Sequence, residues 1–157
     1  MRAIMEFVEV LESCDDPAVA EAVLGAINTL FERELRLLSL GAKEEAIAFH
    51  LAGYLKPYFP ELNVDFEYDR MGDAPKTVTY DELPQRVYPD IIVHIRETRT
   101  NILAVELKKD TNRETKNRDI RKLRAYRREL EYRHALFLRF GTGDAAGTIC
   151  ECERVNA

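Results

Sequence analysis

The stretch VYPDIIVHIRETRTNILAVELKK, residues 87–109, decides the fold because it contains two β-rich runs joined by a short polar segment. The runs VYPDIIVHI and ILAVEL are separated by RETRTN, so we expect them to pair as an antiparallel hairpin. A hairpin centred on Thr98 places Asp90 directly opposite Glu106. Because strand side chains alternate between faces, Lys108 lies on the same face as Glu106. The sequence therefore predicts one patch that holds two carboxylates and one ammonium group.

These three residues have the chemistry of a divalent metal site. Two carboxylates that face each other repel unless a cation lies between them, and hard oxygen ligands favour Mg²⁺ or Mn²⁺. The Lys108 ammonium could orient a water molecule and offset charge on a phosphate. The alternative for Glu106 and Lys108 is solvent-exposed charge at the end of a strand. That alternative suits Asp90 less well, because apolar residues flank it on both sides and a buried carboxylate needs a partner.

The segments around the hairpin predict an α/β fold. Residues 43–58 form an expected helix with an apolar stripe, and Glu44 lies along this stripe. Its alternative role is that of an acid at the helix start, where it meets the helix dipole. The polar residues 70–86 suggest a long excursion from the sheet. The other expected elements are a strand at 62–68, a helix at 115–132, a strand at 134–140 and an edge strand at 148–152.

The first 40 residues are expected to be helical and to precede the α/β core. Asp15 or Asp16 before Pro17 is a start signal for a helix. An apolar stripe must pack on the core of the domain or on a second copy of the chain, which leaves a homodimer through the N-terminal helices open. We expect a single domain over residues 1–157, with an N-terminal extension at 1–40 and a core at 41–153. The stripe consists of Val19, Val23, Ile27, Leu30 and Leu37.

The charge of the chain is unevenly distributed. The formal net charge is −5, but residues 1–69 hold 5 basic and 14 acidic residues, whereas residues 108–133 hold 11 basic and 5 acidic residues. A local basic surface can attract phosphates even on an acidic chain, because salt screens distant charges. The three cysteines have no disulfide framework, which is typical of reduced thiols in a cytoplasm. No apolar run approaches the roughly 20 residues that span a bilayer, so we expect no membrane partner.

The hairpin also carries a resemblance to a known family. Pro89-Asp90, 15 intervening residues and then Glu106-Leu107-Lys108 resemble the signature of the PD-(D/E)xK nuclease superfamily. This superfamily includes restriction endonucleases, Holliday-junction resolvases and RecB-type nucleases. The segments KEEAIAFHLAGYLKPYFPELNVDFEYDR, VYPDIIVHIR and ILAVELKK are similar to a group of small bacterial members. The resemblance covers roughly residues 41–140 and implies a restriction-endonuclease-like αβββαβ core with a mixed central sheet and extra N-terminal helices.

The resemblance implies a metal-dependent nuclease in the cytoplasm that hydrolyses phosphodiester bonds of nucleic acid, with DNA as the expected substrate. It makes Asp90 and Glu106 ligands of Mg²⁺ or Mn²⁺, with the Leu107 carbonyl as a further ligand. Lys108 becomes the catalytic lysine, and Glu44 joins or supports the metal site. The helix after the lysine often contributes a polar residue. The candidate nucleic-acid contacts are Lys109, Arg121, Lys122 and Tyr126.

Two other functions stay open at this point. One is a nuclease-fold module that is catalytically weak or inactive and serves as a nucleic-acid or protein adaptor. The other is a self-assembling subunit driven by the N-terminal stripe. The presence of Asp90, Glu106 and Lys108 together favours activity, whereas the acidic overall charge favours weak or assisted binding of nucleic acid.

Overall fold

The computed structural model describes residues 8–11, 14–67, 70–71 and 74–156. The helices are α2 (Pro17–Arg33), α3 (Leu35–Ser39), α4 (Glu44–Leu55) and α5 (Asn117–Glu129), with 3-10 turns η1 (Lys56–Tyr58) and η2 (Gly143–Ala145). The strands are β1 (Asn63–Phe66), β2 (Arg70–Met71), β3 (Ala74–Pro75), β4 (Thr77–Tyr80), β5 (Leu83–Arg86), β6 (Ile91–His94), β7 (Asn101–Lys109), β8 (His134–Phe140) and β9 (Ile149–Arg154). The predicted α/β class is confirmed.

The central sheet is mixed, as predicted. Its five strands follow the order β1-β6-β7-β8-β9. β1, β6 and β7 are antiparallel neighbours, β8 is parallel to β7, and β9 is antiparallel to β8. Parallel neighbours need a crossover connection, and α5 supplies it between β7 and β8.

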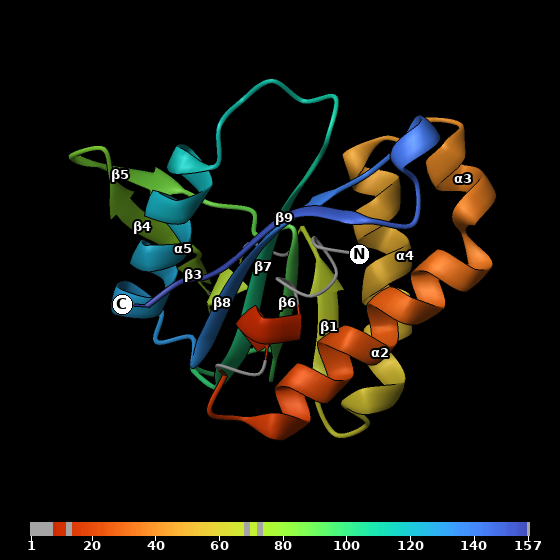
Figure 1. The fold of residues 1–157 in the computed structure, drawn as a ribbon. Coiled ribbons are helices and arrows are strands. Elements are labelled where there is room, and N and C mark those ends of the chain that lie inside the picture. The colour runs from red at the N-terminus through yellow and green to blue at the C-terminus, as the bar shows by residue number, and fades with distance from the viewer. Residues whose placement is uncertain (1–7, 12–13, 68–69, 72–73, 157) are drawn as a thin grey trace.

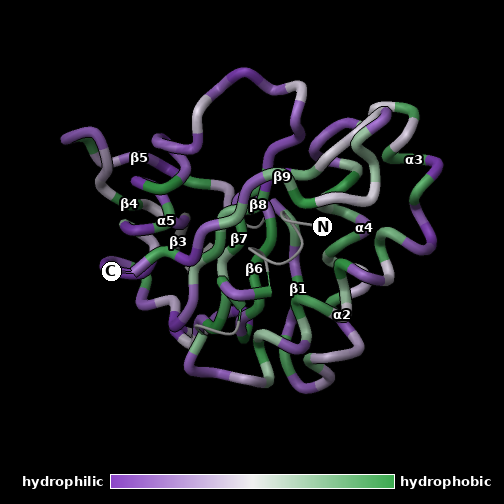
Figure 2. Tube along the Cα trace, viewed as in Figure 1, coloured by the Kyte–Doolittle hydropathy of each residue, from purple (hydrophilic) through white to green (hydrophobic). Residues whose placement is uncertain are grey.

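Helices cover both faces of this sheet (Figure 1). Ile91 and Val93 belong to a core with α2 and α4, whereas Ile92, between them in β6, belongs to a core with α5. This alternation explains why β6 begins with three successive apolar residues, because both of its faces are buried. Figure 2 accordingly shows hydrophobic residues concentrated along the central strands.

The predicted hairpin register is confirmed for Ile91 to Val93 of β6. Ile91 pairs with Val105, and Ile92 pairs with Ala104. The register shifts by one residue between Val93 and His94, next to the turn. On the other side, the ladder ends at Ile91, and Asp90 reaches β7 through its side chain, which accepts a hydrogen bond from the Leu107 amide.

The N-terminal helices begin as the sequence predicts and then depart from it. Asp16 is the N-cap of α2, and its side chain accepts a hydrogen bond from the Val19 amide at 3.3 Å. The helix ends at Arg33, and α3 starts a new helix at Leu35. This break changes the helical phase, so the fully buried residue is Leu38 and not the predicted Leu37. The stripe on α2 packs into the core that α4 and the sheet share, so the chain itself buries the surface that suggested a dimer.

The excursion at 70–86 is more ordered than its composition suggests. It forms two small antiparallel pairs, β2 with β3 and β4 with β5. β4 packs against α5, and Val78 and Tyr80 alternate into the core beneath that helix. Within the described part of the chain, no helix has both the length and the hydropathy to cross a membrane.

Candidate metal centre

Asp90 is the residue immediately before β6, so it lies just outside the part of that strand that pairs with β7. Its Oδ2 atom accepts a hydrogen bond from the Leu107 amide at 2.8 Å. The first residue beyond the β6 ladder therefore binds β7 through its side chain. This contact holds the Asp90 carboxyl group beside that of Glu106.

The negative charge of Glu106 acts on the Asp90 carboxyl group, so the two carboxyl groups lie near each other. Burial and the negative charge of Glu106 raise the pKa of Asp90 well above its usual range, against smaller opposing effects of the Leu107 amide and Lys122. Two carboxyl groups in this position compete for ionisation, because each negative charge disfavours the other. The predicted pair is thus assembled in the structure, and it accommodates a second negative charge poorly unless a cation is added.

Glu106 is almost completely enclosed, with 2% of its surface exposed. Its Oε1 atom accepts a hydrogen bond from the Tyr126 hydroxyl at 2.7 Å and lies 3.2 Å from Lys122 Nζ. Tyr126 and Lys122 lie four residues apart on α5, so they project from the same face of the helix. Two of the three candidate nucleic-acid contacts on α5, Lys122 and Tyr126, therefore point inwards at Glu106, away from the outer surface of the helix.

Lys108 is held in an ion-pair network on the α5 side of β7. Its Nζ atom lies 3.2 Å from Asp119 Oδ2 and 3.2 Å from Glu114 Oε2. Burial lowers the pKa of Lys108, but Asp119 and Glu114 outweigh this effect and raise it. The lysine therefore stays positively charged at neutral pH. Asp119 is almost fully buried whereas the Glu114 side chain is 67% exposed, so Glu114 is the partner that a ligand could displace.

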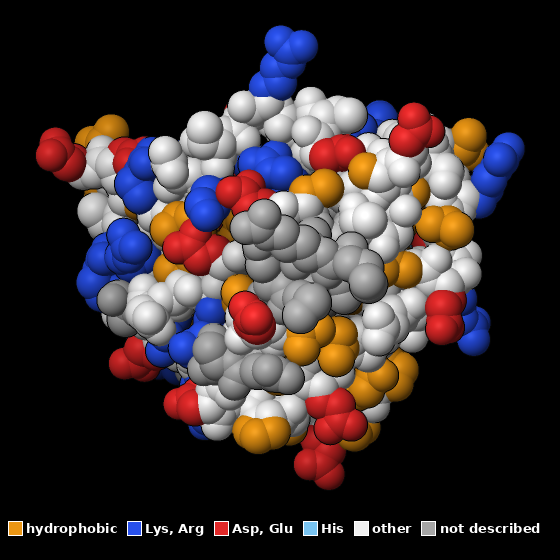
Figure 3. All heavy atoms as spheres, viewed as in Figure 1, with side chains coloured by type: hydrophobic (Ala, Val, Ile, Leu, Met, Phe, Trp, Pro, Cys, Tyr) orange, Lys and Arg blue, Asp and Glu red, His pale blue; other side chains and the backbone are white. Residues whose placement is uncertain are grey.

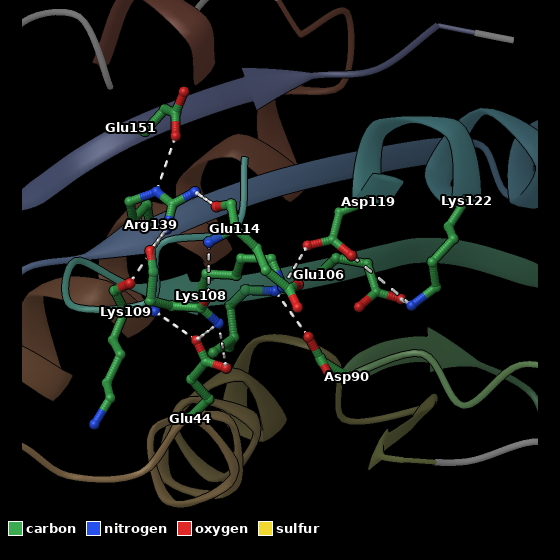
Figure 4. A network of polar contacts seen from close by, with 12 residues as sticks. Glu44, Asp90, Glu106, Lys108, Lys109, Glu114, Asp119, Lys122, Arg139 and Glu151 are labelled. Carbon is green, nitrogen blue, oxygen red and sulfur yellow. Dashed lines mark hydrogen bonds and ion pairs between the residues drawn. The ribbon is translucent and has the colours of Figure 1, made fainter. Parts of the chain in front are cut away.

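Glu44 approaches β7 from the first turn of α4. Its Oε2 atom accepts a hydrogen bond from the Lys109 amide at 2.8 Å, and both of its oxygens lie near Asn112 Nδ2 at 3.1–3.2 Å. The Lys109 ammonium donates in turn to the carbonyl groups of Gly41 and Ala42, just before α4. Figure 4 shows Glu44 and Asp90 on one side of β7, and Asp119 and Lys122 on the other.

The oxygen atoms at this edge of β7 suit a hard cation. The amides of Leu107 and Lys109 donate to Asp90 and Glu44. The N–H and C=O groups of one strand residue point to the same edge, so the Leu107 carbonyl points to the edge that these two carboxylates occupy. Carboxylate and carbonyl oxygens are the ligands that Mg²⁺ and Mn²⁺ prefer. Asp90, Glu106 and the Leu107 carbonyl could thus hold such an ion, and Glu44 lies beside them.

Three further residues support the site without having been predicted. Asp119 could have been found from its position, because it shares the buried stripe of α5 with Leu123 and Tyr126. Arg139 fixes the loop after β7 through the carbonyls of Lys109, Asn112 and Glu114, at 3.3, 3.0 and 2.8 Å. For Arg139 and Asn112 the sequence holds no comparable signal, because both act on a loop whose path depends on the complete fold.

Arg121 lies away from the Asp90–Glu106 pair, on the exposed side of α5. Its Nε atom is 2.6 Å from Asp81 Oδ1, in the turn between β4 and β5. Both side chains are more than two-fifths exposed, so the pair is open to solvent and to charged ligands.

Comparisons with known proteins identify no relative. No protein-family model matches the chain, and no curated protein or solved structure matches it. The function is therefore inferred from the geometry of Asp90, Glu106 and their neighbours.

Proposed function

We propose that this chain is a divalent-metal-dependent nuclease of the PD-(D/E)xK type, which hydrolyses phosphodiester bonds of DNA. The observation that carries the proposal is the position of the Asp90 carboxyl group, which the Leu107 amide holds near the buried Glu106 carboxyl group. Lys108, two residues after Glu106, lies on the same face of β7 and keeps its positive charge. A carboxylate pair with an adjacent ammonium is the set of groups that metal-assisted phosphodiester hydrolysis requires.

The order of the elements supports the same proposal. α4, β1, β6, β7, α5 and β8 follow one another as αβββαβ, with the β2–β5 excursion between β1 and β6. The first three strands form an antiparallel meander, and α5 connects β7 to the parallel β8. The site lies where β7 extends past the end of β6. This arrangement agrees with a restriction-endonuclease-like core.

Each residue of the centre has a distinct proposed role. A bound Mg²⁺ or Mn²⁺ ion would supply positive charge to the scissile phosphate and make water a stronger acid. Asp90, Glu106 and the Leu107 carbonyl hold the ion. Lys108 orients the attacking water and offsets negative charge on the phosphate, because Asp119 fixes its ammonium group while the exposed Glu114 can give way.

The remaining groups keep these residues in position. Tyr126 and Lys122 orient the Glu106 carboxylate from α5. Glu44 fixes the end of β7 through the Lys109 amide and supports the metal site from α4, on the same side of the strand as Asp90. Because α4 and α5 both hold β7, the centre is built on rigid elements rather than on a loop.

The exposed face of α5 suits a polyanionic substrate. Arg118, Arg121, Arg124 and Arg128 are exposed, and their spacing of three or four residues aligns them along one side of the helix. In Figure 3 Lys and Arg side chains gather on the left of the molecule, over α5. Such a row of arginines can contact successive phosphates without reading the base sequence. We therefore propose that DNA approaches the metal centre along α5.

A second candidate function is a nuclease-fold adaptor that binds metal or nucleic acid without turnover. The observation that favours it is that Lys108 and Glu106 are already paired with neighbouring side chains of the protein. Lys108 pairs with Asp119 and Glu114, and Glu106 pairs with Tyr126 and Lys122. A substrate must displace Glu114 before it reaches Lys108, which would slow or prevent turnover.

A cleavage assay tests the proposed activity directly. Purified protein is incubated with supercoiled plasmid, linear duplex, single-stranded DNA and RNA, with Mg²⁺ or Mn²⁺ and with EDTA. We expect metal-dependent cleavage of DNA that falls at least about 100-fold in Asp90→Asn and Lys108→Met, because each removes a group that acts on the reacting phosphate.

Exposed residues of the same type supply matched controls. Asp144→Asn and Lys56→Met change side chains that the structure places at the surface, and both should cleave as the parent does. Circular dichroism confirms that each variant is folded. Cleavage that persists in Asp90→Asn would show that the assigned centre is wrong. Metal binding without cleavage of any substrate would instead favour the adaptor.

A further inference from the structure

A second group of side chains that could bind a metal ion lies at the N-terminal end of β8. Cys14, Asp15 and His134 each offer one ligand atom, and these atoms all lie within 4.8 Å of one another. Cys14 and Asp15 come from the segment before α2, whereas His134 is the first residue of β8. His134 pairs with Leu103 and Arg139 pairs with Lys108. The cluster is thus five residues along the strand from Lys108, or roughly 17 Å, and is separate from the Asp90–Glu106 centre.

His134 is held so that one ring nitrogen faces Cys14. Its Nε2 atom lies 3.4 Å from Asp16 Oδ2, and its Nδ1 atom lies 3.6 Å from Cys14 Sγ. An Asp beside Nε2 favours the tautomer with its proton on that atom, which leaves the Nδ1 lone pair directed at Cys14. Asp16 is itself fixed because it caps α2. This is the arrangement in which a carboxylate orients a histidine towards a metal ion.

The distances within the cluster fit a tetrahedral ion. A Zn²⁺ ion binds a thiolate at about 2.3 Å and an imidazole nitrogen at about 2.0 Å, so two such ligands at a tetrahedral angle are about 3.5 Å apart. The separation of Cys14 Sγ and His134 Nδ1, at 3.6 Å, agrees with this value. The ligand set contains sulfur, nitrogen and oxygen. A thiolate and an imidazole favour Zn²⁺ over Mg²⁺, which prefers oxygen ligands alone.

We propose that Cys14, Asp15 and His134 form a Zn²⁺ site in which Asp16 positions the histidine. Binding releases the Cys14 thiol proton to solvent, so one thiolate and one carboxylate balance the charge of the ion. Three protein ligands leave a fourth coordination position. A cavity of about 690 Å³, lined by Asp15, Asp16, His134, Arg127, Arg133 and Arg154, gives water access to that position.

The site would fasten the N-terminal segment to the central sheet. Cys14 and His134 are 120 residues apart in the chain, and the described contacts between them are a thiol–imidazole contact and the neighbouring Asp16–His134 pair. A metal ion that joins them stabilises the folded state, because the unfolded chain presents no such preformed site. Zn²⁺ should therefore raise the melting temperature of the protein in the absence of any substrate.

Cobalt substitution tests this site without reference to nuclease activity. Co²⁺ is titrated into the metal-free full-length chain in a reducing buffer that does not bind metal. We expect a thiolate-to-cobalt charge-transfer band in the near ultraviolet that saturates at one equivalent and disappears when Zn²⁺ is added. Cys14→Ser should abolish this band, and Asp16→Asn should weaken affinity roughly 10-fold or more, although Asn still caps a helix.

Other residues of the chain provide the controls. Cys150→Ser and Cys152→Ser should keep the band. Asp90→Asn should also keep it, because the oxygen ligands of the Asp90–Glu106 centre cannot produce a thiolate band. If Cys14→Ser does not fold, Asp15→Asn at an exposed position should weaken cobalt affinity in a folded protein. Absence of the band in the parent protein, or its persistence in Cys14→Ser, would overturn the proposal. A Cys14 thiol that alkylates equally fast with and without Zn²⁺ would also overturn it.

Discussion

The Tyr126 hydroxyl donates a hydrogen bond to the Glu106 carboxylate at 2.7 Å, across the interface between α5 and β7. Both residues are almost completely buried. Burial and the Glu106 charge raise the pKa of Tyr126 well above its usual range, so the phenol is protonated and donates at neutral pH.

Removal of this hydroxyl should destabilise the protein. In Tyr126→Phe the buried Glu106 carboxylate loses a donor, and a hydrogen bond to a charged group is worth about 1.5–3 kcal/mol. We expect the free energy of unfolding in urea, measured without divalent metal, to fall by that amount. Tyr88→Phe is the matched control because Tyr88 is 52% exposed, and it should change stability by no more than about 0.5 kcal/mol. Equal effects in the two variants would contradict the proposed importance of the buried bond.

Asp90→Asn should stabilise the metal-free protein at neutral pH. The pKa of Asp90 is raised in the folded state by burial and by Glu106, so its stabilising contribution is complete below the ordinary pKa of aspartate and is lost as pH rises through the folded-state value. An uncharged amide avoids that loss. We expect unfolding in EDTA to show a gain of roughly 1–2 kcal/mol at neutral pH, and the gain should shrink as the pH falls towards 4. A gain that grows in acid would contradict the direction of this shift.

A divalent metal ion should offset the destabilising repulsion between Asp90 and Glu106. In the parent protein, Mg²⁺ or Mn²⁺ at about 100 times its dissociation constant stabilises the folded state by about 2.7 kcal/mol, which corresponds to a rise of roughly 5–10 °C in melting temperature for a chain of this size. Glu106→Gln should abolish most of the rise. Glu45→Gln, at an exposed position next to Glu44, should retain it. A parent melting curve that does not respond to either ion would count against the centre.

Lys108 and Asp119 should be energetically coupled. Their charged atoms lie 3.2 Å apart, and Asp119 is 5% exposed, so either single change leaves a charge in a mostly buried site. We expect a double-mutant cycle of Lys108→Met and Asp119→Asn, followed by urea denaturation, to give a coupling energy of about 1–3 kcal/mol. The pair of Lys108 with the exposed Glu114 should give less than about 1 kcal/mol. Additive effects at Lys108 and Asp119 would mean that the ion pair does not hold the lysine.

Arg121 should contribute to DNA affinity without contributing to sequence preference. It is exposed on α5, and its Asp81 partner is also solvent-accessible. In Arg121→Ala we expect weaker binding to duplexes of any sequence, and the slope of log K against log salt should become shallower by about 1 because one phosphate contact is lost. Binding is measured by fluorescence anisotropy on a catalytically inactive Asp90→Asn background. Arg36→Ala, on α3, should leave both affinity and slope unchanged.

The sequence predicted the hairpin of β6 and β7 because strand alternation and a short connection together determine a register. Ile91 faces Val105 as predicted, and β8 begins and ends where the apolar run HALFLRF does. In both cases the information is local, since one period and one turn are sufficient.

Features that depend on tertiary contacts were predicted less well. The polar residues 70–86 suggested a long excursion from the sheet, but β4 packs against α5 there and pairs with β5. The break after Arg33 changes the helical phase, so Leu38 is the buried residue where Leu37 was expected. The contact between Cys14 and His134 joins segments at opposite ends of the chain, and no local pattern in the sequence indicates it.

The sequence separations of the Asp90–Leu107 and Cys14–His134 contacts imply an order of assembly. The bond from the Leu107 amide to Asp90 closes a loop of 17 residues, whereas the Cys14–His134 contact joins residues 120 apart. Closing a longer loop costs more chain entropy, and distant contacts form late. During synthesis, His134 leaves the ribosome long after residues 14–16. The N-terminal segment can therefore dock on His134 only after β8 has joined the sheet. The docking of that segment on His134 is therefore expected to be among the last events of folding.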